Sequence, residues 1–375
     1  MAAGLKGRSL LLMVHIPHHR WRVLLSLSLA ACNTGCATMV YYSQAITGHV
    51  RVMAAVEPIS SVTADPNTSD ALRDRLTTIE RVRRFASEHL SLPENGSYRS
   101  YADIGREFVV WNVFAAPEFS LEPIKSCFPF AGCVTYRGYF NERSARAFAE
   151  RLRAQGNDVY VGGAVAYSTL GWFDDPVLNT MLRWSKLRVA RLIFHELAHQ
   201  KLYIKHDSAF NEAFATTVER VGAERWLRFE DHKRAWIEFE REQAREVEFI
   251  ALALGTRAKL AWIYVSDLDR HDKRKAKSAA VDEMRQAYRC FRARWNGYSG
   301  YDEWMAKDLN NAKFASLLTY HEHTKAFDTL FENVDTDLPR FYELARAIGK
   351  LDPKQRLNCL QDIARHGGRD CPSSN

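Results

Sequence analysis

Apolar residues recur at every third or fourth position over much of this 375-residue chain. The spacing of Leu72, Leu76 and Ile79 is typical of an amphipathic helix. We therefore expect residues 41–92 to be largely helical, with a break at 65–68, where Asp, Pro and Asn follow one another.

The pattern then changes to short runs of β-branched and aromatic residues bounded by proline and glycine. Three such runs, at 108–114, 133–140 and 158–163, predict strands. Helical spacing over 142–155 separates the last two. These runs predict a small sheet in this part of the chain.

Two helices joined by a tight turn are expected next. Apolar spacing extends the first helix to about residue 203, and Asp207 or Ser208 is a good N-cap for a second helix that continues through Phe214 and Val218. An antiparallel hairpin of this kind would bring residues near the end of one helix level with residues near the start of the next.

The remaining chain has the composition of long amphipathic helices. Residues 228–295 are rich in Arg, Glu, Ala and Leu, and Gly255 and the charged cluster at 267–277 are the expected breaks. Further helices are expected over 311–331 and 339–349. The charge of this region is most simply that of a solvated face.

The N-terminal segment has the features of an export signal. Four basic residues precede an apolar run at 23–31 that is too short to span a bilayer. The run ends in Leu29-Ala30-Ala31-Cys32, which resembles a bacterial lipobox, and Cys36 is a second candidate for acylation. We expect a lipid anchor at one of the two. Because neither is followed by Asp, we expect placement in the outer membrane, facing the periplasm.

Removing the four basic residues of the signal lowers the formal net charge from +7 to +3. No basic patch interleaved with aromatic residues is visible, so nucleic acid is not an expected partner. Of the seven cysteines, lipidation at Cys32 leaves an even number for an oxidising compartment, and lipidation at Cys36 leaves five. Cys127 and Cys133, with Pro and Gly between them, are the pair that we expect to be bridged.

The first helix of the expected hairpin carries a His-Glu-Leu-Ala-His run at 195–199. Residues four apart lie on one face of a helix, so His195 and His199 can bind one metal ion with Glu196 beside them as a general base. Catalytic zinc takes three protein ligands and leaves a position for water. Glu212, on the second helix, is the preferred third ligand.

Two other residues of the hairpin are alternatives for the site. His206 competes with Glu212 as third ligand but falls in the expected turn. Glu219 is expected to be a solvated helix residue, and the alternative is a supporting role at the metal.

Several stretches resemble a bacterial lipoprotein family described as predicted aminopeptidases. They are YYSQA (41–45), NGSYRSYAD (95–103), VWNVFAAPEF (110–119), YRGYF (136–140) and AYSTLGWFDDP (166–176), together with the two helix motifs at 194–199 and 210–215. The resemblance covers most of the mature chain. It implies zinc ligation by His195, His199 and Glu212, catalysis by Glu196, and a lipidated cysteine at Cys36.

Two departures separate the chain from thermolysin-like gluzincins. Those enzymes have an acid four residues after the ligand glutamate, where this chain has Thr216, and their connection between the second histidine and the glutamate exceeds the twelve residues found here. The resemblance to gluzincins is therefore confined to the helices of the site. The residue that supports His195 cannot be carried over.

These features favour a zinc metallopeptidase acting on peptides, with an aminopeptidase as the first choice. The alternatives are an endopeptidase of envelope proteins or wall peptides, and a lipid-anchored interaction module with structural zinc. Glu196 argues against the last, because a structural site has no use for a base.

Other residues are assigned to the substrate. Tyr320 or Tyr167 is expected to stabilise the oxyanion. His321 and His323 are two residues apart and would lie on different helix faces, so we do not expect them to bind one metal ion together. Glu118 is the preferred partner for a substrate ammonium group, with Asp174 or Asp175 as alternatives.

The fold class expected is α+β. It comprises a zincin-like domain with a small sheet ahead of the metal helices and a mainly helical C-terminal part. We divide the chain into a signal and lipobox region (1–35), an N-terminal helical segment (36–100), a catalytic core (101–227) and a helical region that completes the cleft (228–375).

Overall fold

The computed structural model describes residues 39–128, 132–306, 309–318, 323–368 and 371. The chain forms two compact units, residues 1–48 and 49–375, and the described residues of the first are helical. None of the helices that the structure describes is long and apolar enough to cross a membrane. The segment expected to be an export signal and both candidate lipidation sites, Cys32 and Cys36, lie outside the described residues.

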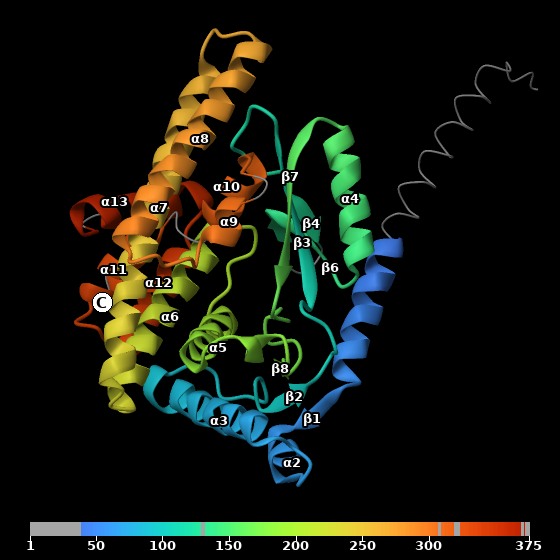
Figure 1. The fold of residues 1–375 in the computed structure, drawn as a ribbon. Helices are drawn as coiled ribbons and strands as arrows, with labels where there is room; N and C mark the ends of the chain where they lie inside the picture. Colours follow the sequence, from blue (N-terminus) through green and yellow to red (C-terminus); the bar gives the residue numbers. More distant parts are fainter. Residues whose placement is uncertain (1–38, 129–131, 307–308, 319–322, 369–370, 372–375) are drawn as a thin grey trace, which may run out of the picture. The chain divides into compact units, whose positions relative to one another are not determined.

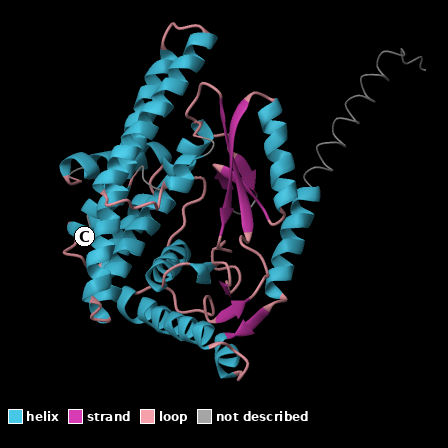
Figure 2. Cartoon of the chain, viewed as in Figure 1, coloured by secondary structure: helices cyan, strands magenta, loops and turns pink. Residues whose placement is uncertain are grey.

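The second unit is a mixed α+β structure with small sheets, and 63% of the residues that the structure describes are helical. Figure 2 shows the strands gathered in one part of this unit, with long helices beside them. The expected combination of a small sheet and a mainly helical C-terminal part is confirmed at this level.

The larger sheet is built around one central strand (Figure 1). Strand β3 (Val110–Pro117) pairs antiparallel with β6 (Tyr136–Tyr139) on one side and with β7 (Asn157–Ala164) on the other. Helix α4 (Glu142–Ala154) connects β6 to β7, starts at the N-cap Asn141 and packs against β3 and β7. The runs of β-branched and aromatic residues thus form strands where the sequence predicted them.

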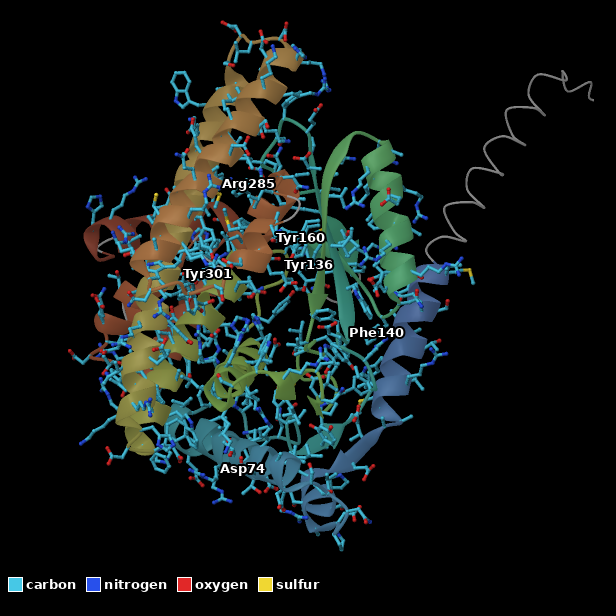
Figure 3. The ribbon with its side chains drawn as sticks, viewed as in Figure 1. Asp74, Tyr136, Phe140, Tyr160, Arg285 and Tyr301 are labelled. Carbon is cyan, nitrogen blue, oxygen red and sulfur yellow. A yellow bond between two sulfur atoms is a disulfide. The ribbon has the colours of Figure 1, made fainter. Side chains whose placement is uncertain are left out.

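Aromatic side chains from three strands meet on this sheet (Figure 3). Tyr136 of β6 and Tyr160 of β7 flank Phe114 of β3, with ring centroids 5.3 and 6.0 Å from that of Phe114. The ammonium group of Lys313, on helix α10 (Asn311–Leu318), lies 5.0 Å from the centre of the Tyr160 ring. Because α10 also packs against β3 and β7, it covers this part of the sheet.

A second sheet combines two strands that precede the larger sheet in the chain with one that follows it. Strand β1 (Val56–Pro58) pairs antiparallel with β2 (Ser100–Ala102), and β2 pairs parallel with β8 (Val177–Leu178), which the short turn η1 (Met181–Arg183) follows. Helices α2 (Ile59–Ala64) and α3 (Asp70–Leu90) lie between β1 and β2. The expectation of helix over 41–92 was therefore wrong at β1, where Pro58 cannot supply a helical N–H.

A disulfide-linked hairpin lies between β3 and β6 in the chain. Strands β4 (Ser126–Phe128) and β5 (Gly132–Val134) pair antiparallel, and Cys127 is bonded to Cys133. A second disulfide joins Cys359 to Cys371, and Cys290 is free and exposed.

The two longest C-terminal helices form an antiparallel hairpin. Helix α7 (Lys233–Val265) continues through Gly255, where the sequence predicted a break, and the chain turns at 266–269 before α8 (Arg270–Arg294). One glycine costs about 1 kcal/mol in a helix, and packing of apolar residues such as Phe249 and Leu260 outweighs that cost.

The chain ends in short helices that complete the core. They are α9 (Asp302–Ala306), α10, α11 (Thr324–Glu332), α12 (Leu338–Gly349) and α13 (Pro353–His366). The sequence did not predict α9 or α13. The helix expected over 311–331 corresponds to α10 and α11, with residues 319–322 between them outside the described part. Phe327 of α11 and Phe341 of α12 are fully buried against Phe214, whose ring stacks on that of Phe341 at 5.6 Å.

Candidate metal site and its surroundings

The site is carried by helices α5 (Lys186–Lys201) and α6 (Ser208–Phe229), which pack along each other. The Ser185 hydroxyl accepts a hydrogen bond from the backbone N–H of Arg188 at the start of α5. The Asp207 carboxylate does the same for Phe210 at the start of α6. Both are side chains that favour N-caps, so local sequence sets where each helix begins.

The turn between the helices is held by Asn211. Its side-chain amide donates to the carbonyl of Ile204 and its side-chain oxygen accepts from the Ile204 N–H, both at 2.8 Å. The buried Arg356 of α13 donates to the Asp207 carboxylate at 2.7 Å. These contacts fix the position of Glu212, the next residue, opposite α5. Sequence reasoning did not assign this role to Asn211.

Three ligand-type atoms converge between the helices. The Nε2 atoms of His195 and His199 are 3.1 Å apart, and the Glu212 Oε2 lies 3.2 Å from the first and 3.7 Å from the second. Their side chains are only 10%, 8% and 15% exposed. His195, His199 and Glu212 thus form a cluster that could hold a metal ion.

His206 does not join this cluster. It lies in the turn with a positive φ of 68°, and its Nδ1 accepts the backbone N–H of Cys133 at 2.9 Å. The imidazole therefore holds the disulfide hairpin against the helix pair.

Glu219 supports His195, contrary to its interpretation as a solvated residue. Its Oε2 is 3.0 Å from the His195 Nδ1, and its Oε1 accepts from Arg191 Nε at 2.7 Å. Because a carboxylate accepts, Nδ1 carries a proton, and Nε2, 3.2 Å from the Glu212 Oε2, is the nitrogen that is left to bind a metal ion. Metal-binding histidines commonly donate their second N–H to a carboxylate in this way.

The charges of the cluster shift its pKa values. Burial tends to raise the pKa of Glu212, but His199 and His195 outweigh it and lower the pKa to about 2. The pKa of Glu219 is also lowered to about 2, because His195 and Arg191 outweigh the effect of burial. Both glutamates are therefore acceptors at neutral pH.

Glu196 lies on α5 next to His195 but outside the cluster. Burial raises the pKa of its carboxyl group, and His199 and His195 oppose the shift. Glu196 shares a helix face with Gln200, four residues later. A carboxylate with a raised pKa beside candidate metal ligands has the properties expected of a general base.

Two loops cover the face of α5 that carries Gln200. The Gln200 side chain donates to the Ser97 hydroxyl at 3.2 Å and accepts from Asn95 at 2.8 Å. The Ser97 hydroxyl also accepts the backbone N–H of Asp175 at 3.3 Å, and the Asp175 carbonyl accepts the N–H of Tyr98 at 2.7 Å. The loops at 95–98 and 168–175 are thus linked to each other and to α5.

The buried Arg83 fixes the first of these loops. It is 1% exposed and donates to the carbonyls of Ser97, Pro93 and Asn95. A buried guanidinium is favourable only when its donors are satisfied, so this arginine orders the loop.

Asp175 and Tyr98 lie near Glu196. Burial raises the pKa of Asp175 to about 6, and the charge of Glu196 adds to the shift. Burial also raises the pKa of Tyr98, with Glu196 and Asp175 contributing. The Tyr98 hydroxyl has no hydrogen-bond partner among the described residues, and its backbone has a φ of 61°. Sequence reasoning did not assign a role to Tyr98.

Tyr167 lies beside the same loop. Its hydroxyl is 2.8 Å from the Nδ1 of His49, and burial, with a contribution from Asp175, raises its pKa. Tyr320, the preferred oxyanion residue, lies outside the described residues, as does His321.

Glu118, which the sequence suggested as the ligand of a substrate ammonium group, is paired with two arginines of α8. Its carboxylate accepts from Arg274 and Arg270 at the start of α8, and these hydrogen bonds and charges lower its pKa. A carboxylate already paired with two guanidinium groups ties β3 to α8. It is not available to a substrate.

Fold and site together define a mixed α+β protein with a His-His-Glu cluster that could hold a metal ion. Comparison with family models matches residues 40–360 to the family described as Putative aminopeptidase. The chain belongs to this family, whose description suggests peptidase activity. No curated protein and no solved structure matches the chain.

Proposed function

We propose that the protein is a zinc-dependent aminopeptidase with a zincin-like arrangement of its active-site helices. The observation that carries the proposal is the convergence of His195, His199 and Glu212, with Glu196 adjacent on α5. Membership of the aminopeptidase family supports the same reaction class.

The spacing of the three ligand atoms fits zinc. Bonds of about 2.0–2.2 Å in a tetrahedron place ligand atoms roughly 3.3–3.6 Å apart. The separations here are 3.1, 3.2 and 3.7 Å. Two imidazole nitrogens and one carboxylate oxygen form a ligand set that catalytic zinc uses, and such sites keep a fourth position for water.

Bound zinc would polarise the substrate carbonyl and lower the pKa of water to about 7. Glu196 then accepts the proton of the attacking water and donates it to the leaving amine. Its raised pKa suits both steps, because a base must release the proton again. Glu219 holds His195 in the tautomer that leaves Nε2 free.

An aminopeptidase must also bind the ammonium group of its substrate. Asp175 is the best candidate for this role among the carboxylates near Glu196. Asp175 is 2% exposed and its charge is disfavoured by burial and by Glu196. A cation nearby would offset both effects. This role replaces the one first given to Glu118.

Metal analysis tests the ligand set. His195→Ala, His199→Ala and Glu212→Gln should each lose the single zinc ion that we expect in the wild type. His206→Ala is the matched control, because His206 lies in the same hairpin and binds Cys133 instead. Full zinc occupancy in His199→Ala would remove the assignment.

Peptides with free and acetylated N-termini test the aminopeptidase hypothesis. The wild type should prefer the free amine, and Asp175→Asn should raise KM for free-amine substrates alone, whereas Glu118→Gln should leave KM unchanged. Comparable kcat/KM for internal cleavage of blocked peptides would instead favour an endopeptidase.

The proposed location is the bacterial envelope, with a lipid anchor at Cys32 or Cys36. Two disulfides use four of the seven cysteines, which supports an oxidising compartment. Labelling with a palmitate analogue should mark the wild type, and Cys32→Ala and Cys36→Ala should show which cysteine is acylated. Recovery of the protein in the cytosol would contradict this location.

A further inference from the structure

The loop at 168–175 exposes two large aromatic side chains. Trp172 is 71% exposed and Phe173 is 54% exposed. Large apolar groups held in water are unfavourable, and when grouped they often mark a binding surface.

The loop is ordered by its own hydrogen bonds, so its aromatic residues are held in place. The Asp175 carboxylate accepts from the backbone N–H of Thr169 at 3.0 Å. The Thr169 hydroxyl bonds to both the N–H and the carbonyl of Phe173 at 3.1 Å, and the Thr169 carbonyl accepts from Trp172 at 3.1 Å. Gly171, with a φ of 81°, supplies the left-handed residue that the turn requires.

The loop lies against the helix of the metal cluster. A Cβ atom added to Gly171 would be 3.6 Å from the Gln200 Cγ, and Asp175 and Gln200 share the Ser97 hydroxyl. Gln200 is one turn of α5, about 6 Å, from Glu196 on the same face. An extended peptide covers this distance in roughly two residues.

One side of the exposed pair is already lined by aromatic rings. The His49 ring lies 4.7 Å from that of Phe173 and 6.0 Å from that of Tyr167. Phe140 in turn contacts Tyr167 at 5.2 Å. Phe173 therefore continues, through His49, a series of aromatic contacts that includes Tyr167 and Phe140.

We propose that Trp172 and Phe173 form a subsite for a large apolar side chain of the substrate, within about two residues of the scissile bond. The substrates would then be peptides with Leu, Phe or a similar residue near the cleaved end. This inference rests on the proposed peptidase function.

The test compares Trp172→Ala and Phe173→Ala with the wild type on matched peptides that carry Leu, Phe or Ala beside the cleaved bond. We expect the variants to lose roughly tenfold to a hundredfold in kcat/KM for the Leu and Phe peptides and little for the Ala peptide. Trp262→Ala is the control, because Trp262 is 78% exposed but lies near the end of α7. An equal loss on all peptides, or no loss, would overturn the subsite.

Binding of the same peptides to a Glu196→Gln background separates this inference from the catalytic one. Calorimetry should show weaker binding of the Leu and Phe peptides after Trp172→Ala, with the Ala peptide unchanged. If the wild type cleaves no peptide but this selectivity in binding is seen, the peptidase proposal fails and the subsite stands. If selectivity is the same with and without Trp172 and Phe173, the subsite fails even where cleavage is efficient.

Discussion

Glu219 orients His195, and the only sign of this role in the sequence is the spacing of seven residues between Glu212 and Glu219. Seven residues are two turns of a helix, so Glu212 and Glu219 lie on one face of α6. Comparison with thermolysin-like enzymes does not predict this role, because this chain has Thr216 where those enzymes have an acid. A search for any acid on that face of α6 would have found Glu219.

Replacing Glu219 should weaken metal binding without removing it. Glu219→Gln loses the charge that fixes the His195 tautomer, and we expect about 10–100-fold lower zinc affinity. Competition with a chelator measures this. Glu224→Gln, one to two turns further along α6, pairs only with surface arginines in the contacts seen here and should leave the affinity unchanged. Equal affinities for wild type and Glu219→Gln would show that His195 is oriented by other means.

Asp175 gives stability a predictable dependence on pH. Its pKa is about 6 in the folded state against an ordinary 3.8, so the folded state holds the proton more tightly. The contribution to stability is fully present below about pH 4 and is lost as the pH rises to about 6, with a difference of about 3 kcal/mol at most. Stability is lost at the higher pH because burial raises the pKa of Asp175 rather than lowering it.

Asp175→Asn removes this titration. Urea denaturation at pH 4 and pH 6.5 should show the variant gaining stability relative to the wild type at the higher pH. Asp174→Asn, at the exposed neighbouring position, is the matched control. If the difference in stability between wild type and Asp175→Asn does not change with pH, the raised pKa of Asp175 is contradicted.

At the scale of elements, helices with clear periodicity and caps were predicted from sequence. The hairpin of α5 and α6, with its cap at Asp207, and the strands β3 and β7 lie close to their expected positions. The misses have physical causes. Gly255 did not end α7, because the packing of the α7 and α8 hairpin outweighs one glycine, and the three-residue β1 depends on pairing with β2, forty residues away in the chain.

Two helical glycines allow a paired test of this packing. A Cβ atom at Gly222 of α6 would lie 2.6 Å from the Phe194 ring and 2.9 Å from a Leu90 methyl, whereas nothing lies within 4 Å of one at Gly255. Gly222→Ala should destabilise the protein by roughly 1–3 kcal/mol through overpacking. Gly255→Ala should instead stabilise it by up to about 1 kcal/mol.

Thermal denaturation of both glycine variants measures the effects. Because Phe194 directly precedes His195, Gly222→Ala should also lower zinc affinity, and Gly255→Ala should not. Stabilisation by Gly222→Ala would show that α5 and α6 are not closely packed at this point.

At the scale of the whole molecule, the site joins segments that are distant in the chain. The candidate metal ligands His195, His199 and Glu212 come from one hairpin and follow from its sequence. The loops at 95–98 and 168–175 reach α5 through Ser97 and Gln200, contacts that no local pattern encodes. For the same reason Glu118, in an extended segment ahead of the helix, was assigned to the site although it pairs with α8.

Metal binding should stabilise this assembly, because the ligands come from two helices and the ion binds only the folded state. Removing zinc with a chelator should lower the Tm by several degrees, and adding zinc back should restore it. Glu212→Gln should show no such response to the chelator. An unchanged Tm for the wild type after verified removal of the metal would mean that the ion does not link α5 to α6.

The most direct test of the central claim is kcat/KM for a free-amine peptide, measured for wild type and Glu196→Gln at equal zinc content. The account predicts hydrolysis by the wild type and a loss of roughly 10²–10⁴-fold in Glu196→Gln, because the ligands remain while the base is gone. Hydrolysis by Glu196→Gln at the wild-type rate would contradict the claim that this helix pair is a peptidase site.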